Sequence, residues 1–129
     1  MNVARIIFGI IYLFGAGFNI FLAVTEGWQI YIGFADETFF PFYREAWMAV
    51  AAPNITLLVV LLIAFEISLG LIFIISRKYL KIALILGILF CIASMPTMVQ
   101  AIYTNASLAL IQAFLLWKEL RRSAAVKSA

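Results

Sequence analysis

Glu66 is the side chain best placed to do chemistry, because it is an acid in the middle of a long apolar stretch. The stretch from residue 55 to residue 76 is long enough to cross a membrane, which takes about 20 apolar residues. Glu66 lies about 16 Å from the start of that stretch at the usual helical rise. Ionisable groups at this depth are costly and usually face a helix contact or a polar cavity. No Lys or Arg lies at a matching depth, so we expect a protonated acid that is hydrogen-bonded to an amide or a hydroxyl.

The simpler hypothesis for Glu66 is that it only joins two helices, with its proton donated to a carbonyl or an amide. Gly70 lies one turn later on the same helical face. A glycine there suits both hypotheses, because it lets a second helix or a ligand approach closely.

Each of the other apolar stretches contributes one amide: Asn19 in the first, Gln100 in the third and Gln112 in the fourth. Counted from the helix ends, all three fall in the outer half of the membrane. If their faces converge, they form a polar pocket that opens outward and has Glu66 at its floor. The alternative is that each amide separately joins two helices, which contributes about 0.6 kcal/mol.

Two further side chains are expected to line such a pocket. Tyr12 shares a helical face with Asn19, and Met95 adjoins Pro96, which we expect to kink the third helix. Methionine adapts to irregular apolar ligands, although a methionine beside a kink is more often ordinary packing. The candidate ligand-binding residues are therefore Glu66, Asn19, Gln100, Gln112, Gly70, Tyr12 and Met95.

Several classes of chemistry have no support in the composition. The chain has no histidine and one cysteine, so the commonest metal and haem ligand is missing and no disulfide pair exists. There is no nucleophile beside a base and no glycine-rich phosphate loop. We therefore expect no enzyme, no metal site and no cofactor other than a bound quinone or lipid.

The composition requires a membrane to accommodate these helices. The chain is 67% hydrophobic and 12% charged, beyond what a small soluble domain can bury. We predict one all-α transmembrane domain over residues 1–122, a four-helix bundle with helices at 3–24, 55–76, 82–103 and 106–120. The long connection between the first two helices is rich in aromatic residues and should carry an interfacial helix at 41–51. A turn at 104–105 separates the last two helices, and residues 123–129 are expected to be a disordered tail.

The basic residues orient the predicted bundle. The net charge is +3, and every Lys and Arg except Arg44 flanks an apolar stretch on the side shared by both termini and the turn at 77–81. Positive charge favours the cytoplasmic side, so we predict a multi-pass cell-membrane protein with both termini inside. This placement explains the basic charge without a nucleic-acid partner.

The same residues are similar to the DoxX-like family of small four-helix membrane proteins. The first helix opens with Arg5, and the second carries the run from Phe65 to Leu71, with Glu66 and Gly70, before Arg77 and Lys78. The resemblance implies a four-helix bundle that works beside redox or quinone-linked membrane complexes, or that helps other membrane proteins mature. It carries over Glu66 and Gly70 alone. The absence of histidine and of a cysteine pair argues against direct electron transfer by this chain.

Three hypotheses for function follow. The first is a bundle that binds a quinone or a lipid, or serves as an accessory subunit of a redox-linked membrane complex, with Glu66 orienting the ligand. The second is a proton-coupled small-molecule transporter that works as a homodimer, similar to small multidrug transporters. Those proteins carry their acid in the first helix, where this chain has Asn19. The third is an assembly subunit whose partners are membrane lipids and a larger membrane complex.

Overall fold

The computed structural model describes residues 2–27, 29–33, 38, 40–94 and 99–128, and every element in that part of the chain is helical. The all-α prediction is confirmed there. The elements are α1 (Asn2–Thr25), α2 (Gln29–Gly33), α3 (Pro41–Ala46), a π-helical turn (Trp47–Ala51), a 3-10 turn (Ala52–Asn54), α4 (Ile55–Ile75), α5 (Leu80–Ser94) and α6 (Val99–Ser128).

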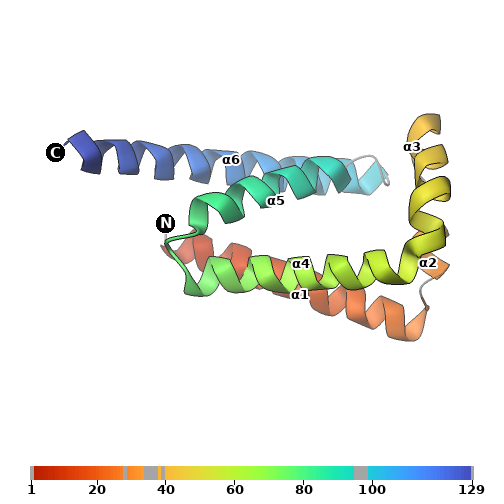
Figure 1. The fold of residues 1–129 in the computed structure, drawn as a ribbon. Coiled ribbons are helices and arrows are strands. Elements are labelled where there is room, and N and C mark those ends of the chain that lie inside the picture. The colour runs from red at the N-terminus through yellow and green to blue at the C-terminus, as the bar shows by residue number, and fades with distance from the viewer. Residues whose placement is uncertain (1, 28, 34–37, 39, 95–98, 129) are drawn as a thin grey trace.

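The long helices form two antiparallel pairs, α1 with α4 and α5 with α6 (Figure 1). Both termini lie at one end of the molecule, and α3 stands across the other end. Helix α5 begins close to the end of α4 and then diverges from it toward α6 as it approaches α3 (Figure 1). The two pairs therefore separate beneath α3.

A pair of glycines brings α1 and α4 together. A Cβ added at Gly9 would lie 2.9 Å from the Gly70 carbonyl oxygen, and one added at Gly70 would lie 2.9 Å from the Gly9 carbonyl oxygen. Any larger residue would push the two backbones apart. Gly70 therefore serves the close approach of a helix, one of the two roles predicted for it.

The core has two parts, one at each end of the molecule. Near the termini it is built from Phe8, Tyr12, Leu69, Phe73, Leu80, Ala83, Leu84 and Leu115, which come from all four long helices. Tyr12 stacks on Phe73 with 5.7 Å between the ring centroids. Near α3 a smaller cluster joins Tyr31, Ile55 and Val59. This second cluster fixes α2 against α4.

The chain bends between α3 and α4 at Pro53. Proline has no amide hydrogen to continue the helical bonding, and the residues before it adopt a wider π-helical turn. The predicted helical segment at 41–51 is confirmed as α3 followed by this turn. Asn54 immediately precedes α4, but its side chain makes no capping bond; its Nδ2 donates to the Val50 carbonyl at 2.9 Å instead.

The predicted boundary between the third and fourth helices is wrong. We placed the helices at 82–103 and 106–120, whereas α5 ends at Ser94 and α6 begins at Val99. Pro96 lies between them, outside the described residues. The polar residues at 104–105 are inside α6, where Ser107 Oγ bonds back to the Tyr103 carbonyl at 2.8 Å. A side chain that bonds within its own helix does not end it, whereas proline removes a backbone donor.

The predicted disordered tail at 123–129 is also wrong as far as the structure describes it. Helix α6 continues to Ser128. Its last residues include Ala124, Ala125 and Lys127, which are good helix formers, and they extend a helix that is already nucleated.

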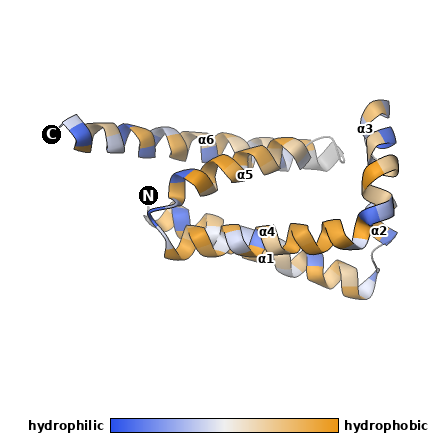
Figure 2. Cartoon of the chain, in the orientation of Figure 1, coloured by the Kyte–Doolittle hydropathy of each residue, from blue (hydrophilic) through white to orange (hydrophobic). Residues whose placement is uncertain are grey.

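Hydrophobic residues predominate along α4 and α5, whereas the end of α6 near the C-terminus carries hydrophilic residues (Figure 2). Large side chains such as Phe14, Leu110 and Ile75 are more than two-thirds exposed, at 75%, 71% and 74%. In the described residues, two helical stretches are long and apolar enough to cross a membrane, Val3–Thr25 and Pro41–Ile75, and Leu80–Ser94 is a shorter apolar helix.

Candidate functional site

Glu66 lies in the contact between α1 and α4. It is 6% exposed, and Asn19 Nδ2 donates a hydrogen bond to Glu66 Oε2 at 2.9 Å. Gly15 makes room for this acid, because a Cβ there would lie 2.9 Å from Glu66 Oε1. The structure therefore joins Glu66 to one of the three predicted amides.

A chain of hydrogen bonds runs from Glu66 to the segment after α3. Tyr31 of α2 donates its hydroxyl proton to Asn19 Oδ1 at 2.8 Å, with the Asn19 carbonyl also near at 3.1 Å. Trp47 Nε1 donates to the Tyr31 carbonyl at 3.0 Å. Asn19 Nδ2 also donates to the Gly15 carbonyl at 3.1 Å, so the amide is engaged at both its ends. Two donated hydrogen bonds and one accepted hydrogen bond therefore fix the orientation of the Asn19 amide.

The Tyr31 hydroxyl stays a donor in this chain. Burial raises the pKa of Tyr31 above its ordinary value of 10.0. A phenol whose pKa is raised keeps its proton at neutral pH.

A cavity of about 360 Å³ adjoins this chain beneath α3. Its polar and aromatic end is formed by Asn19, Tyr31, Tyr43 and Trp47. Its apolar walls come from α4 and α5, chiefly Ile55, Leu58, Val59, Leu62, Phe90 and Ala93. Glu66 was expected at the floor of the pocket, but the lining reaches Asn19 and Tyr31 instead. Glu66 therefore contacts Asn19, which lines the cavity, and does not line it itself.

An apolar groove continues from the cavity along the surface between α4 and α5. The groove holds about 420 Å³ and shares four lining residues with the cavity, namely Leu58, Leu62, Phe90 and Ala93. Its remaining lining, Leu61, Phe65, Leu86 and Leu89, is entirely apolar. Cavity and groove together form one amphipathic recess, polar under α3 and apolar along the helices.

Helix α3 covers the polar end of this recess. Tyr43 Oη donates to the Ala93 carbonyl at the end of α5, at 3.1 Å, and its ring stacks on Trp47 with 6.3 Å between centroids. This hydrogen bond joins α3 to the end of α5 across the cavity.

Tyr12 and Gln112 form a second polar cluster, separate from the first. Tyr12 Oη donates to Gln112 Oε1 at 3.1 Å, and Gln112 Nε2 donates to the Leu108 carbonyl at 3.3 Å and lies 3.6 Å from Cys91 Sγ. Gln112 is fully buried, and Gly87 makes room for it. Neither Tyr12 nor Gln112 lines the cavity, so here the amide joins helices, as the alternative hypothesis proposed.

The remaining predicted residues fall outside the recess or outside the described part of the chain. Gly70 faces Gly9 and does not line the cavity. Met95 lies among residues that the structure does not describe. Gln100 belongs to α6, but its side chain is likewise outside the description.

Tyr31, Tyr43 and Trp47 line the cavity but were predicted only as interfacial aromatics. The spacing of four between Tyr43 and Trp47 in a predicted helix could have placed both on one face. Glu119 was not predicted either; it is 5% exposed, and its Oε2 has no hydrogen-bond partner among the described residues. Its Oε1 lies 4.0 Å from Arg122 Nη2.

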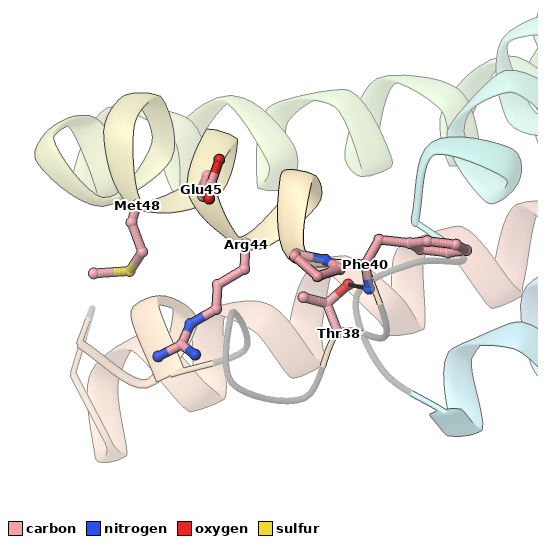
Figure 3. Close-up of a pocket in the computed structure, with 6 residues that line it drawn as sticks. Thr38, Phe40, Arg44, Glu45 and Met48 are labelled. Carbon is pink, nitrogen blue, oxygen red and sulfur yellow. Dashed lines mark hydrogen bonds between the residues drawn. The ribbon is translucent and has the colours of Figure 1, made fainter.

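A second recess lies on α3 and the residues before it. It holds about 440 Å³ and is lined by Thr38, Phe40, Pro41, Arg44, Glu45 and Met48. Figure 3 shows Arg44 and Met48 extending away from the helix. The recess mixes charged and apolar side chains, and it includes no member of the hydrogen-bonded chain from Glu66. We therefore take the amphipathic recess under α3 as the candidate site.

Comparison of the chain with protein-family models, with curated proteins and with solved structures finds no match. Membership of the DoxX-like family therefore stays a prediction. Among the described residues, no group of three or more His, Cys, Asp or Glu side chains could hold a metal ion.

Proposed function

We propose that this chain is an integral membrane protein that binds a lipophilic molecule with a hydroxylated head group in the recess under α3. The four long helices cross the bilayer, with both termini on the cytoplasmic side. The exposed apolar side chains on the outer faces support insertion, because contact between a large apolar surface and water is unfavourable. Helix α4, with 21 residues, is about 30 Å long, which matches the hydrocarbon thickness.

The distribution of charge supports this orientation. The turn between α4 and α5 carries Arg77 and Lys78, and the end of α6 carries Arg121 and Arg122. Both regions lie at the end of the molecule that holds the termini (Figure 1). Basic residues beside membrane spans favour the cytoplasm.

The observation that carries the proposal is the continuity of the cavity with the groove. A cavity of about 360 Å³ is large enough for a ring-sized head group, since ligand pockets begin at about 300 Å³. The groove beyond it faces the surrounding lipid and is lined only by apolar side chains. A molecule with a compact polar head and an apolar tail, such as a quinol or a lipid, fits both parts at once.

The hydrogen-bond pattern specifies the head group further. Asn19, Tyr31, Tyr43 and Trp47 each donate a hydrogen bond within the protein. The hydroxyl oxygen of Tyr43 can also accept a hydrogen bond. Tyr43 therefore complements a ligand that donates, such as a quinol or a lipid hydroxyl.

Glu66 has a positioning role in this function. It holds the Asn19 amide, which holds the Tyr31 hydroxyl at the polar end of the cavity. A buried network in which each member is satisfied specifies one geometry. The geometry of the polar end is thus set before a ligand binds.

The test uses two neighbouring leucines. Leu58 lines the recess and Leu57 lies outside it at 59% exposure, so Leu58→Trp fills the site while Leu57→Trp adds the same bulk elsewhere. Purified protein is extracted with organic solvent, and bound lipophiles are quantified by mass spectrometry per mole of protein. We expect Leu58→Trp to lose the ligand and Leu57→Trp to retain it; equal retention by both variants would exclude the recess as the site.

A chemical control tests the proposed donor. Delipidated protein is titrated calorimetrically with a short-chain benzoquinol and with its dimethyl ether, which has the same ring but no donor protons. We expect the ether to bind at least about tenfold more weakly, the equivalent of roughly one hydrogen bond. Equal affinities would remove the hydrogen-bond argument, even if the recess binds both.

A further inference from the structure

The middle of α6, from Leu110 to Arg121, carries an exposed face. Leu110, Phe114 and Trp117 are 71%, 54% and 50% exposed, and they follow one another at spacings of four and three residues. Lys118 and Arg121 continue the same face. The opposite face, with Gln112, Leu115 and Glu119, is the one buried in the protein, so this face is directed outward.

The aromatic and basic side chains of this face are arranged together. The rings of Phe114 and Trp117 have centroids 5.8 Å apart. Lys118 Nζ lies 5.5 Å from the centroid of Phe114, and Arg121 Cζ lies 5.0 Å from that of Trp117. A recess of about 300 Å³ is lined by Trp117, Lys118 and Arg121. Contact with the rings holds both cations at the edges of one recess.

Neither cation is neutralised by an acid within the part of the chain that the structure describes. Glu119 lies between them in sequence but is buried on the opposite face, and its ion-pair contact is with Arg122. The recess is therefore cationic, and its chemical complement is an anion beside an apolar surface.

We propose that this face of α6 binds an anionic phospholipid, with the head-group phosphate between Lys118 and Arg121 and an acyl chain along Phe114 and Leu110. The proposal rests on the membrane location proposed above but is independent of the recess under α3. Arg121 can bind phosphate oxygens in a bidentate way. Trp117 lies between the apolar and the basic part of the face, as tryptophan does at membrane interfaces. The distance from Leu110 to Arg121 along the helix is about 16 Å, close to half the hydrocarbon thickness.

The face is apolar at its start and basic at its end, and this order favours a phospholipid over a soluble anion. A free phosphate would use the two cations alone, whereas a phospholipid also covers the exposed apolar residues that precede them. Each basic residue near an anionic surface contributes about fivefold in affinity. Two such residues give this lipid a preference over a zwitterionic one that has the same acyl chains.

The experiment measures lipid preference at Trp117 itself. Full-length protein with Trp28→Phe and Trp47→Phe has Trp117 as its single tryptophan. It is reconstituted in phosphatidylcholine vesicles that contain increasing fractions of brominated phosphatidylglycerol or brominated phosphatidylcholine. Bromine quenches tryptophan on contact, so the two quenching curves give the relative affinity for the anionic lipid beside α6.

We expect phosphatidylglycerol to be preferred about fivefold or more, and the preference to fall to about one in Lys118→Gln/Arg121→Gln. The matched control, Arg77→Gln/Lys78→Gln, removes the same charge at the same end of the molecule and should keep the preference. Equal quenching by both lipids in the parent protein would overturn the proposal. An equal loss in the control variant would also overturn it, because general surface charge would then account for the preference. No quenching by either lipid would instead contradict the membrane placement of α6.

Discussion

The contact between Gly9 and Gly70 leads to the sharpest prediction about stability. In Gly70→Ala the new Cβ would lie 2.9 Å from the Gly9 carbonyl oxygen and 2.8 Å from Leu13 Cγ. Ordinary contacts of this kind are longer by about half an ångström, so the two helices must separate. A carbonyl in a helical backbone cannot turn aside as the end of a side chain can.

The magnitude follows from two opposing terms. Replacing a helical glycine by alanine gains roughly 1 kcal/mol of helix propensity. Overpacking a close contact costs roughly 1–3 kcal/mol, and here the loosened crossing also weakens the packing around it. We therefore expect Gly70→Ala to destabilise the protein by about 1 kcal/mol.

Gly17 provides a matched control for this variant. It lies in α1, and a Cβ at that position would meet no atom within 4 Å. Gly17→Ala should therefore show only the propensity gain, about 1 kcal/mol of added stability. Thermal unfolding in one detergent should separate the two variants by roughly 6–10 °C for a chain of this size. A Gly70→Ala protein as stable as Gly17→Ala would refute the close contact between α1 and α4.

Three further predictions concern other polar side chains. Glu119→Met should raise the free energy of unfolding by about 1 kcal/mol, because an apolar side chain of similar shape replaces a buried carboxyl whose Oε2 has no partner among the described residues. A loss of stability in the thermal melt would mean that the acid has a partner. Tyr12→Phe should lower stability by about 0.6 kcal/mol through its lost bond to Gln112, and no change relative to the exposed Tyr103→Phe would contradict this. Tyr43→Phe should release α3 from the end of α5 and speed ligand exchange with little change in melting temperature, measured by the rate at which a labelled ligand dissociates; an unchanged rate would mean that α3 does not limit access.

The local sequence predicted some helix ends correctly and others wrongly. The polar residues at 104–105 predicted a turn, but a serine or asparagine can satisfy its side chain on the preceding turn of the same helix, as Ser107 does. Proline lacks a backbone donor whatever surrounds it, and the interval that contains Pro96 separates α5 from α6. The absence of a donor is therefore a stronger signal for a helix end than polarity.

For Glu66, the sequence predicted the burial of the side chain but not its hydrogen-bond partner. The position of Glu66 in an apolar stretch already indicated that it must face protein. Which amide it meets depends on how α1 crosses α4, and the glycines decide that crossing. Asn19 therefore pairs with Glu66, whereas Gln112 pairs with Tyr12 in a separate cluster.

Composition and spacing by themselves determined that the chain is helical, that its long helices are apolar and where the acid lies along them, because these properties depend on residue type and local geometry. The recess under α3, the hydrogen bonds through Tyr31 and Trp47, and the burial of Glu119 were decided only by tertiary structure. Each of these features joins segments that are distant in sequence, and a helical period states which residues share a face but not which helix that face will meet.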